Sequence, residues 1–391
     1  MNPLPPPDPA ALAHSEQLRA LIRADIRAQG GSIPFSRYME LALYAPGLGY
    51  YSAGSTKFGV AGDFVTAPEL GPQFAQCVAE AVSPVLRGIG PESDFVELGG
   101  GSGAFAQDVL RALDARHALP RAYRILEPSA DLRERQRTRL HAALKAAVFA
   151  RIEWIDRPPE QPWRGVLFAN EVLDALPTTR FSLAQGEVME EHVALDASGD
   201  FTVRLRPADL LVGGAVRHIE RSLGRAFEDG YRSEVLPQLP YWIQAVCGTL
   251  DRGLALFVDY GYPRSEYYLP ERREGTLVCH YRHRAHADPF HLPGLQDLTA
   301  FVDFTAVAEA GLHAGFELAG FASQAAFLLN NGLQDRLQLA GADAVAQHRR
   351  NLEAKRLTLP GDMGERFKAI GLQRGIDATD QFAFGDQSHR L

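Results

Sequence analysis

Cysteine is scarce in this chain of 391 residues. It has only three cysteines, Cys77, Cys247 and Cys279, which lie far apart and form no Cys-x-x-Cys pair. The odd number argues against a disulfide framework, and the spacing excludes a zinc site built from cysteines. Because this usage is typical of a reducing compartment, we expect a cytoplasmic protein.

Long apolar runs and a basic excess are also missing. No stretch of 18 apolar residues occurs, so no membrane span is predicted. The formal net charge is −8, whereas nucleic-acid-binding domains are usually basic, so we expect no nucleic-acid partner. The stretch from Met1 to Pro9 is rich in proline and has the pattern of neither a secretory signal nor a presequence. It predicts a short disordered tail.

Short apolar strands alternate with helical patterns in the middle of the chain. The expected elements are strand 95–98, helix 104–113, strand 123–126, helix 131–147, strand 151–155 and strand 165–169. This alternation is typical of an α/β fold with a parallel, doubly wound sheet. Ligands of such sheets bind at the carboxyl ends of the strands.

The segments before and after these strands predict further helices and strands. Before the sheet, helices are expected over 10–29, 33–43 and about 68–86, with Thr66 and Glu69 at capping-box spacing before the last one. After the sheet, the period of two from 181 to 205 predicts antiparallel hairpins. The remaining expected elements are helices over 216–231 and 238–251, and strands over 255–258, 315–321 and 381–384.

A glycine-rich turn follows the first expected strand of the sheet. Glu97 precedes Gly99, Gly101 and Gly103, and helical spacing begins at Ala104. Glycines let a ligand approach the backbone, and the helix that follows directs its free N–H groups at the turn. The string resembles the first motif of class I S-adenosylmethionine (SAM) methyltransferases, and Glu97 suits the cationic end of SAM. The turn also matches the looser dinucleotide pattern, so NAD stays open as the cofactor, as does a plain glycine turn that binds no cofactor.

Two further strand ends carry acids. Glu127 follows the second strand, where an acid bonds the ribose hydroxyls in this fold type. Glu171 and Asp174 follow the fourth strand, and a helical turn would place both carboxylates on one side. Such a pair suits a guanidinium, which stays charged and offers five donors. The alternative is that Asp174 caps a short helix and that Glu171 is structural.

Histidines are dense between His280 and His291, yet no metal is expected there. Arg282 and Arg284 are interleaved with them, and their charge opposes a divalent cation. A polar loop is the preferred interpretation. Just after it, Asp297 or Thr299 is expected to cap the next helix.

Taken in order, the motifs resemble a known family. They are Gly59–Glu69, Glu97–Gly103, Asn170–Pro177, Val258–Gly261, Asp288–Phe290 with Pro293–Phe304, and Met363–Lys368. This set, spread over residues 35–368, is similar to the MidA-like family of class I SAM-dependent methyltransferases. The mitochondrial member of that family is the complex I assembly factor that methylates a protein arginine.

The resemblance implies a SAM-dependent protein methyltransferase that acts on an arginine ω-nitrogen, with a respiratory complex I subunit as a candidate substrate. It implies Glu171 and Asp174 as catalytic residues and no metal ligands. The expected cofactor-binding residues are Gly62, Asp63, Phe64, Thr66, Glu97, Gly99, Gly101, Gly103, Glu127 and Asn170. Gly62, Asp63 and Phe64 are expected to close over the cofactor. The stretch from Cys279 to Arg282 departs from the family pattern and leaves the acceptor open.

The expected parts are a tail over 1–9, an N-terminal helical region with the cofactor lid over 10–92, a SAM-binding core over 93–178 and 252–391, and an inserted substrate-side subdomain over 179–251. Two alternatives to a methyltransferase remain. One is an NAD-linked oxidoreductase on the same fold, and the other is a non-catalytic assembly chaperone that keeps the fold. The sequence does not specify an oligomeric state.

Overall fold

The computed structural model describes residues 4–53, 66–338 and 343–391. The chain divides into two compact units. The sheet unit comprises Val65–Val172, Leu239–Pro263 and Val302–Leu391, and the flanking unit comprises Met1–Phe64, Leu173–Gln238 and Arg264–Phe301.

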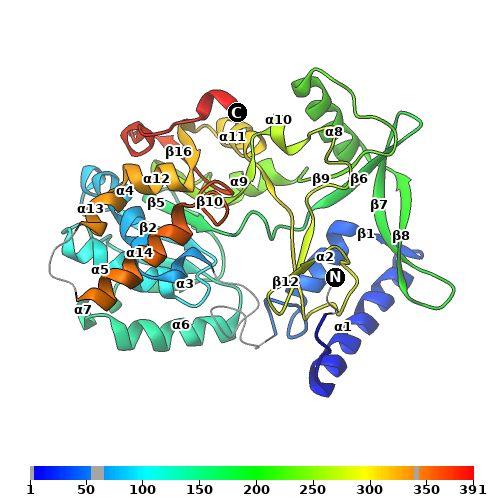
Figure 1. Cartoon of the computed structure of the whole chain (residues 1–391), viewed down its shortest axis with the longest axis horizontal. Coiled ribbons are helices and arrows are strands. Elements are labelled where there is room, and N and C mark those ends of the chain that lie inside the picture. Colours follow the sequence, from blue (N-terminus) through cyan, green and yellow to red (C-terminus); the bar gives the residue numbers. More distant parts are fainter. Residues whose placement is uncertain (1–3, 54–65, 339–342) are drawn as a thin grey trace. The chain divides into compact units, whose positions relative to one another are not determined.

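The sheet unit contains an eight-stranded sheet in the order β15-β16-β10-β5-β2-β3-β4, with β14 paired to β10. Figure 1 labels β2, β5, β10 and β16 of this sheet. Strands β4, β3, β2, β5 and β10 are parallel, whereas β16 is antiparallel to both of its neighbours. The prediction of an α/β fold with a doubly wound sheet is therefore confirmed. The strands are β2 Asp94–Leu98, β3 Tyr123–Leu126, β4 Ile152–Ile155, β5 Trp163–Asn170, β10 Leu250–Tyr262, β14 Val302–Asp303, β15 Glu317–Ser323 and β16 Phe367–Arg374.

The strand order reverses between β2 and β5. The chain runs outward from β2 to β3 and β4, and then returns to β5 on the other side of β2. In open α/β sheets, ligands bind in the crevice outside the carboxyl ends of the strands at such a reversal. The glycine turn after Leu98 and the polar segment after Phe168 lie at these strand ends, so the topology brings two of the predicted motifs to one edge.

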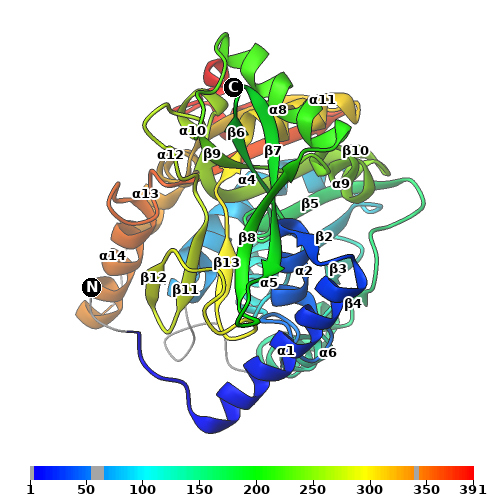
Figure 2. The same ribbon diagram turned by 90° about the vertical axis from the view of Figure 1, so that its right-hand side faces the viewer.

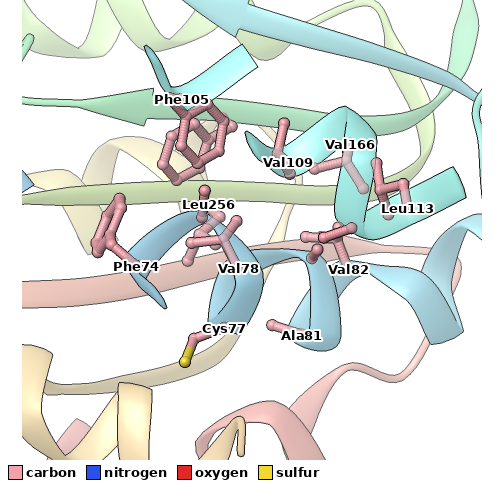
Figure 3. Packing of buried hydrophobic residues seen from close by; sticks show 14 of the residues in the cluster. Phe74, Cys77, Val78, Ala81, Val82, Phe105, Val109, Leu113, Val166 and Leu256 are labelled. Atoms are coloured by element: carbon pink, nitrogen blue, oxygen red, sulfur yellow. The ribbon is translucent and has the colours of Figure 1, made fainter. Parts of the chain in front are cut away.

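Helices cover the sheet of this unit. They are α3 Ala67–Leu70, α4 Gln73–Ile89, α5 Ala104–Ala115, α6 Ala130–Ala143, α7 Ala146–Phe149, α9 Leu239–Cys247, α11 Phe304–His313, α12 Gln324–Asn330, α13 Leu333–Leu337 and α14 Ala344–Thr358, with the 3-10 helices η1 Thr379–Phe382 and η2 Ser388–Arg390. Figure 3 shows the apolar side chains of α4 and α5 packed together with those of β5 and β10. The rings of Phe105 and Phe168 stack with centroids 4.1 Å apart, which anchors α5 directly behind the glycine turn.

The flanking unit contains two smaller sheets. One has the order β1-β7-β6-β9 with β8 paired to β7, and the other has the order β12-β11-β13. Figure 2 shows β7 and β8 side by side as an antiparallel pair, so the predicted hairpins are confirmed. The elements are α1 Pro9–Ala28, β1 Ser32–Pro34, α2 Phe35–Tyr44, β6 Thr179–Ala184, β7 Glu187–Leu195, β8 Phe201–Pro207, α8 Leu210–Leu223, β9 Arg232–Val235, α10 Arg264–Tyr267, β11 Val278–Tyr281, β12 Arg284–His286 and β13 Asp297–Thr299.

The flanking unit groups segments that are far apart in the sequence. Strand β1 pairs with β7, and the Ile33 position faces Val193 in this register. The N-terminal segment and residues 173–238 and 264–301 therefore share one unit, a grouping absent from the expected domain ranges. Alternation within a segment shows that a strand exists, but it does not identify the partner.

Several predicted elements were wrong in position or type. The helix expected over 68–86 is divided at Gly71-Pro72 into α3 and α4, and no side-chain bond from Thr66 caps α3. The backbone N–H of Gln73 instead donates to Oε1 of Glu353 on α14 at 2.6 Å, so a remote carboxylate serves the start of α4. Prolines and glycines are frequent helix boundaries, and Pro72 has no backbone N–H.

The later elements also shift. The helix expected over 216–231 is α8, which begins after the cap Asp209 and ends at Gly224 in the left-handed conformation. Asp297 and Thr299 lie on β13 rather than capping a helix, and Asp303 caps α11 by accepting from the N–H of Ala306 at 3.2 Å. The strand expected over 381–384 overlaps a 3-10 helix instead, and the antiparallel strand β16 was not predicted.

No helix in the described ranges is both long enough and apolar enough to span a membrane.

Candidate active site

The glycine turn connects β2 to α5 in the sheet unit. Gly99, Gly101 and Gly103 have φ angles of 69°, 51° and 81°, all in the left-handed region. Gly103 is the N-cap residue of α5, so the N–H groups that have no partner within that helix begin at the turn, where the first of them, of Ala104, donates to the hydroxyl of Ser102 at 3.3 Å. The N–H of Gly99 donates to the carbonyl of Leu126 at 3.0 Å, which joins the turn to the end of β3.

Glu97 lies on β2 just before the turn and is buried, with 3% of its surface exposed. The hydroxyl of Tyr123 on β3 donates to Oε2 of Glu97 at 2.7 Å. Burial raises the pKa of Glu97 to about 8, and the neighbouring Glu127 adds to this shift, while the hydrogen bond from Tyr123 opposes it. A cation placed against Glu97 would favour the ionised form, so proton loss and cation binding should be coupled at this residue.

This coupling gives a test of Glu97 as the residue that binds the cationic end of SAM. We expect the affinity for S-adenosylhomocysteine (SAH) to rise as the pH is raised from 6 to 8, by about tenfold per pH unit, and to level off above pH 8. The free protein holds Glu97 largely protonated below a pKa of about 8, so binding of the ammonium group must release that proton. Calorimetry in buffers of different ionisation enthalpy measures both the affinity and the proton release.

The control for this measurement is Glu97→Gln, which cannot ionise. Its SAH affinity should lack this rise with pH. A wild-type affinity that stays constant from pH 6 to 8, with no proton release, would show that Glu97 does not bind the cationic end.

Glu127 follows β3 and has only 5% of its surface exposed. Its Oε1 accepts from the backbone N–H of Ser129 at 3.0 Å, and its Oε2 accepts from Nε2 of Gln136 at 3.3 Å. Strands β2 and β3 are adjacent and parallel, so this carboxylate and the glycine turn leave the sheet at the same edge. That is the position expected for the acid that holds ribose hydroxyls.

Asn170 ends β5 on the other side of β2. Its Nδ2 donates to Oε1 of Glu171 at 3.0 Å. Its Oδ1 is buried and has no hydrogen-bond partner among the described residues. Leaving a buried acceptor unsatisfied is costly, so a donor from a ligand at this strand end would stabilise the site. A nucleoside cofactor that carries an amino group fits this acceptor, the glycine turn and the strand-end acids.

Glu171 has a φ of +53°, which is rare for a residue other than glycine. Its backbone N–H donates to the carbonyl of Val258 on β10 at 2.9 Å, and the next N–H, of Val172, donates to Oδ2 of the buried Asp259 at 3.2 Å. Strands β5 and β10 therefore hold Glu171 in a strained backbone conformation at the edge of the sheet where β5 ends. Such strain clusters at functional sites.

Asp174 belongs to the flanking unit and is 5% exposed. Its carbonyl accepts from the N–H of Ala300 at 3.0 Å. Residues 171–176 form bends and turns, so the helical turn that was expected to align Asp174 with Glu171 is absent, and that part of the prediction was wrong. The catalytic role of each acid remains a prediction.

The expected lid residues Gly62, Asp63 and Phe64 lie outside the described residues. Thr66 is described and precedes α3. On α3, Glu69 accepts a hydrogen bond from the hydroxyl of Ser102 in the glycine turn. The segment that follows the expected lid is therefore tied to the turn, and closure of the lid remains a prediction.

The histidine-rich segment forms a hairpin rather than a loop. Strands β11 and β12 pair, and the turn between them places Arg282 and His283 at positive φ. The rings of His286 and His291 lie with centroids 5.4 Å apart. Across the described ranges, no group of three or more histidine, cysteine, aspartate or glutamate residues could hold a metal ion.

Sequence reasoning missed two buried side chains of this site. Asp259 lies within the Val258–Gly261 motif, and its carboxylate accepts from the N–H groups of Val172 and Tyr260. Gln136 lies in the middle of a helix with ordinary polar spacing. An aspartate directly after an apolar strand is a signal that could have identified the first, and no local signal identifies the second.

The sheet order, the glycine turn and the acids at the strand ends define a nucleoside-binding α/β enzyme of the methyltransferase type. A family model for S-adenosyl-L-methionine-dependent methyltransferases matches residues 70–322, more than half of the chain, and the chain belongs to this family. Together with the relatives described next, this match confirms the resemblance to MidA-like methyltransferases.

Solved structures agree with this assignment. The chain superposes on a crystal structure from Burkholderia thailandensis bound to S-adenosylhomocysteine with a TM-score of 0.92 and 45% identity, with 100% of both chains covered. A native crystal structure from the same organism gives a TM-score of 0.90 and 44% identity over 100% of both chains. These findings identify SAM as the cofactor, and the alternative of an NAD-linked oxidoreductase was wrong.

Curated relatives are more distant. The chain is 28% identical to the mitochondrial protein arginine methyltransferase NDUFAF7 homologue of Drosophila melanogaster, over 96% of this chain and 90% of that protein. It is 27% identical to the mitochondrial protein arginine methyltransferase NDUFAF7 of Danio rerio, over 86% of this chain and 82% of that protein. Both are similar along nearly their whole length.

Proposed function

We propose that this protein methylates an arginine ω-nitrogen of another protein, with a respiratory complex I subunit as the first substrate to test. The names of the relatives from Drosophila and zebrafish support the arginine substrate. The observation that carries the proposal is Glu171, an acid held at positive φ at the sheet edge beside an unsatisfied Asn170 acceptor. A carboxylate in this place can accept N–H bonds from a guanidinium.

In this reaction, different residues would bind the cofactor and the acceptor. The glycine turn, Glu97 and Glu127 would bind the cofactor, which would supply an electrophilic methyl group on sulfur. The buried Oδ1 of Asn170 would accept a hydrogen bond from the bound cofactor, and its Nδ2 donates to Glu171 and orients that side chain. Glu171 holds the guanidinium, orients the attacking nitrogen and favours loss of the proton that the methyl group replaces. Asp174 is the second candidate acid for the acceptor.

The proposal includes a cytoplasmic location. The three cysteines are all free and buried in the structure, which is consistent with a reducing compartment. The relatives named above are mitochondrial proteins, whereas the location that we propose for this protein is the cytoplasm.

The test is quantitative mass spectrometry of methylated peptides from cells with and without this protein. We expect one or a few arginine sites to lose their methyl groups in its absence. The purified protein should restore them from labelled SAM. Loss of methylation at lysine, glutamine or a small molecule instead would overturn the arginine proposal. A protein that binds SAH and its partner without any turnover would instead support the assembly-chaperone alternative.

A further inference from the structure

Gln136 on α6 is the most deeply buried polar side chain beside the glycine turn, with no exposed surface. We infer that Gln136 is a positioning residue, which fixes the glycine turn and the Glu127 carboxylate together in the geometry that binds the adenosine part of SAM. The inference rests on the proposed cofactor-binding role of the turn and Glu127. It adds a residue that contacts both of them but belongs to neither motif.

Hydrogen bonds determine how the amide of Gln136 is oriented. The indole Nε1 of Trp154 on β4 can only donate, and it donates to Oε1 of Gln136 at 2.9 Å. The amide nitrogen must therefore point the other way. There, Nε2 donates to the carbonyl of Gly101 at 2.9 Å and to Oε2 of Glu127 at 3.3 Å. Both N–H groups and the oxygen of the amide are satisfied, so the side chain has one preferred orientation.

Packing adds a second link between Gln136 and the turn. A Cβ atom added at Gly100 would lie 2.9 Å from Nε2 of Gln136 and 2.7 Å from Cγ2 of Ile125. A Cβ atom added at Gly103 would lie 3.4 Å from Cα of Gln136. The turn is thus in direct contact with Gln136 at both glycines, and Gln136 and Ile125 together occupy the space that a side chain at Gly100 would need.

The hydrogen bonds from Gln136 restrict two parts of the cofactor site, the backbone of the glycine turn and the carboxylate of Glu127. The carbonyl of Gly101 lies in the middle of the turn, and the hydrogen bond to it restricts the backbone on which the cofactor would rest. The bond to Oε2 restricts the plane of the Glu127 carboxylate, which must be fixed if it is to accept two ribose hydroxyls. The side chain therefore sets the distance between the turn and the ribose-binding acid.

Gln136→Met removes both N–H donors and keeps the length of the side chain. We expect at least a tenfold loss of SAH affinity, because both hydrogen bonds from Nε2 are lost, one of them to a carboxylate, and the bond from Trp154 to Oε1 is lost as well. We also expect a smaller preference for adenosine over 2′-deoxyadenosine, since Glu127 would no longer be fixed against the 2′-hydroxyl. Calorimetry measures all three ligands.

Gln136→Glu gives a readout that a general loss of stability would not produce. It places a second carboxyl group beside Glu127, and two carboxylates at this separation cannot both be ionised easily. When protonated, the introduced carboxyl group can again donate to its neighbour. We therefore expect the SAH affinity of this variant, relative to wild type at each pH, to recover as the pH is lowered from 8 to 5. Gln136→Met should show no such recovery.

Gln347→Met on α14 is the matched control, because Gln347 makes its hydrogen bonds to Leu337 and Asn351 in the same unit. Its SAH affinity should equal that of wild type. If Gln136→Met is unstable, the pH series on the folded Gln136→Glu variant tests the inference instead. If the Gln136 variants bind SAH like wild type while Glu127→Gln binds it weakly, the inference about Gln136 is wrong and the proposed cofactor site is retained. Wild-type affinity in Glu127→Gln as well would instead overturn the proposed cofactor site.

Discussion

Replacing Glu171 by Gln should reduce methyl transfer by about 10²-fold or more and leave SAH affinity nearly unchanged. Positioning and electrostatic terms in enzymes are commonly of this size. The substitution keeps the size of the side chain and removes its charge, which is the property that a guanidinium requires. The backbone conformation at positive φ and the hydrogen bond from the N–H of Glu171 to Val258 do not depend on the carboxylate.

Methyl transfer from labelled SAM to the native partner, and SAH binding by calorimetry, measure the two parts of this prediction. Glu317→Gln, an exposed position at the start of β15, is the control and should match wild type in both. Normal turnover by Glu171→Gln would show that Glu171 is structural. An equal loss of SAH binding would assign Glu171 to the cofactor site instead.

Gly101→Val should eliminate measurable SAH binding in a protein that still folds. Gly101 has a φ of 51°, where a β-branched residue is strongly disfavoured, so the turn must change its course. The changed turn would also displace the Gly101 carbonyl from Nε2 of Gln136. A ligand that rests against the backbone at this turn loses the surface that it needs.

The control for Gly101→Val is Gly88→Ala. Gly88 lies near the end of α4, where an added Cβ meets no atom within 4 Å, so SAH affinity should be unchanged. Circular dichroism and thermal unfolding show whether both variants fold. A folded Gly101→Val protein that binds SAH like wild type would exclude the glycine turn as the cofactor site.

The motifs that sequence reasoning identified are those whose signal is local. Gly99, Gly101 and Gly103 follow an apolar strand directly, and Glu127 follows the next one. In the structure, the turn and this acid leave adjacent parallel strands at the same edge. Because strand, turn and helix are neighbours in the chain, periodicity and residue type predict them together. The apolar strand at 255–258 was found in the same way, although β10 extends well beyond it on both sides.

Features that depend on distant partners were missed. Strand β16 is stabilised by pairing with β10 and β15, and nothing in residues 367–374 alone names those partners. The division of the expected helix at Gly71-Pro72 is accompanied by a bond from Gln73 to Glu353, 280 residues further along the chain. The supposed cap at Asp297 is instead paired in β13, where Cys279 and Leu298 face each other.

The sequence by itself determined the class of sheet, the glycine turn with its strand-end acids, and the family resemblance that the comparisons confirmed. Only the tertiary structure decided that β1 joins the sheet of β7, that Glu171 is held at positive φ by the end of β10, and that Gln136 links Gly101 to Glu127. The physical reason is that backbone preferences and apolar spacing act between near neighbours. Buried hydrogen bonds between distant segments are formed only when packing brings those segments together and removes water from them.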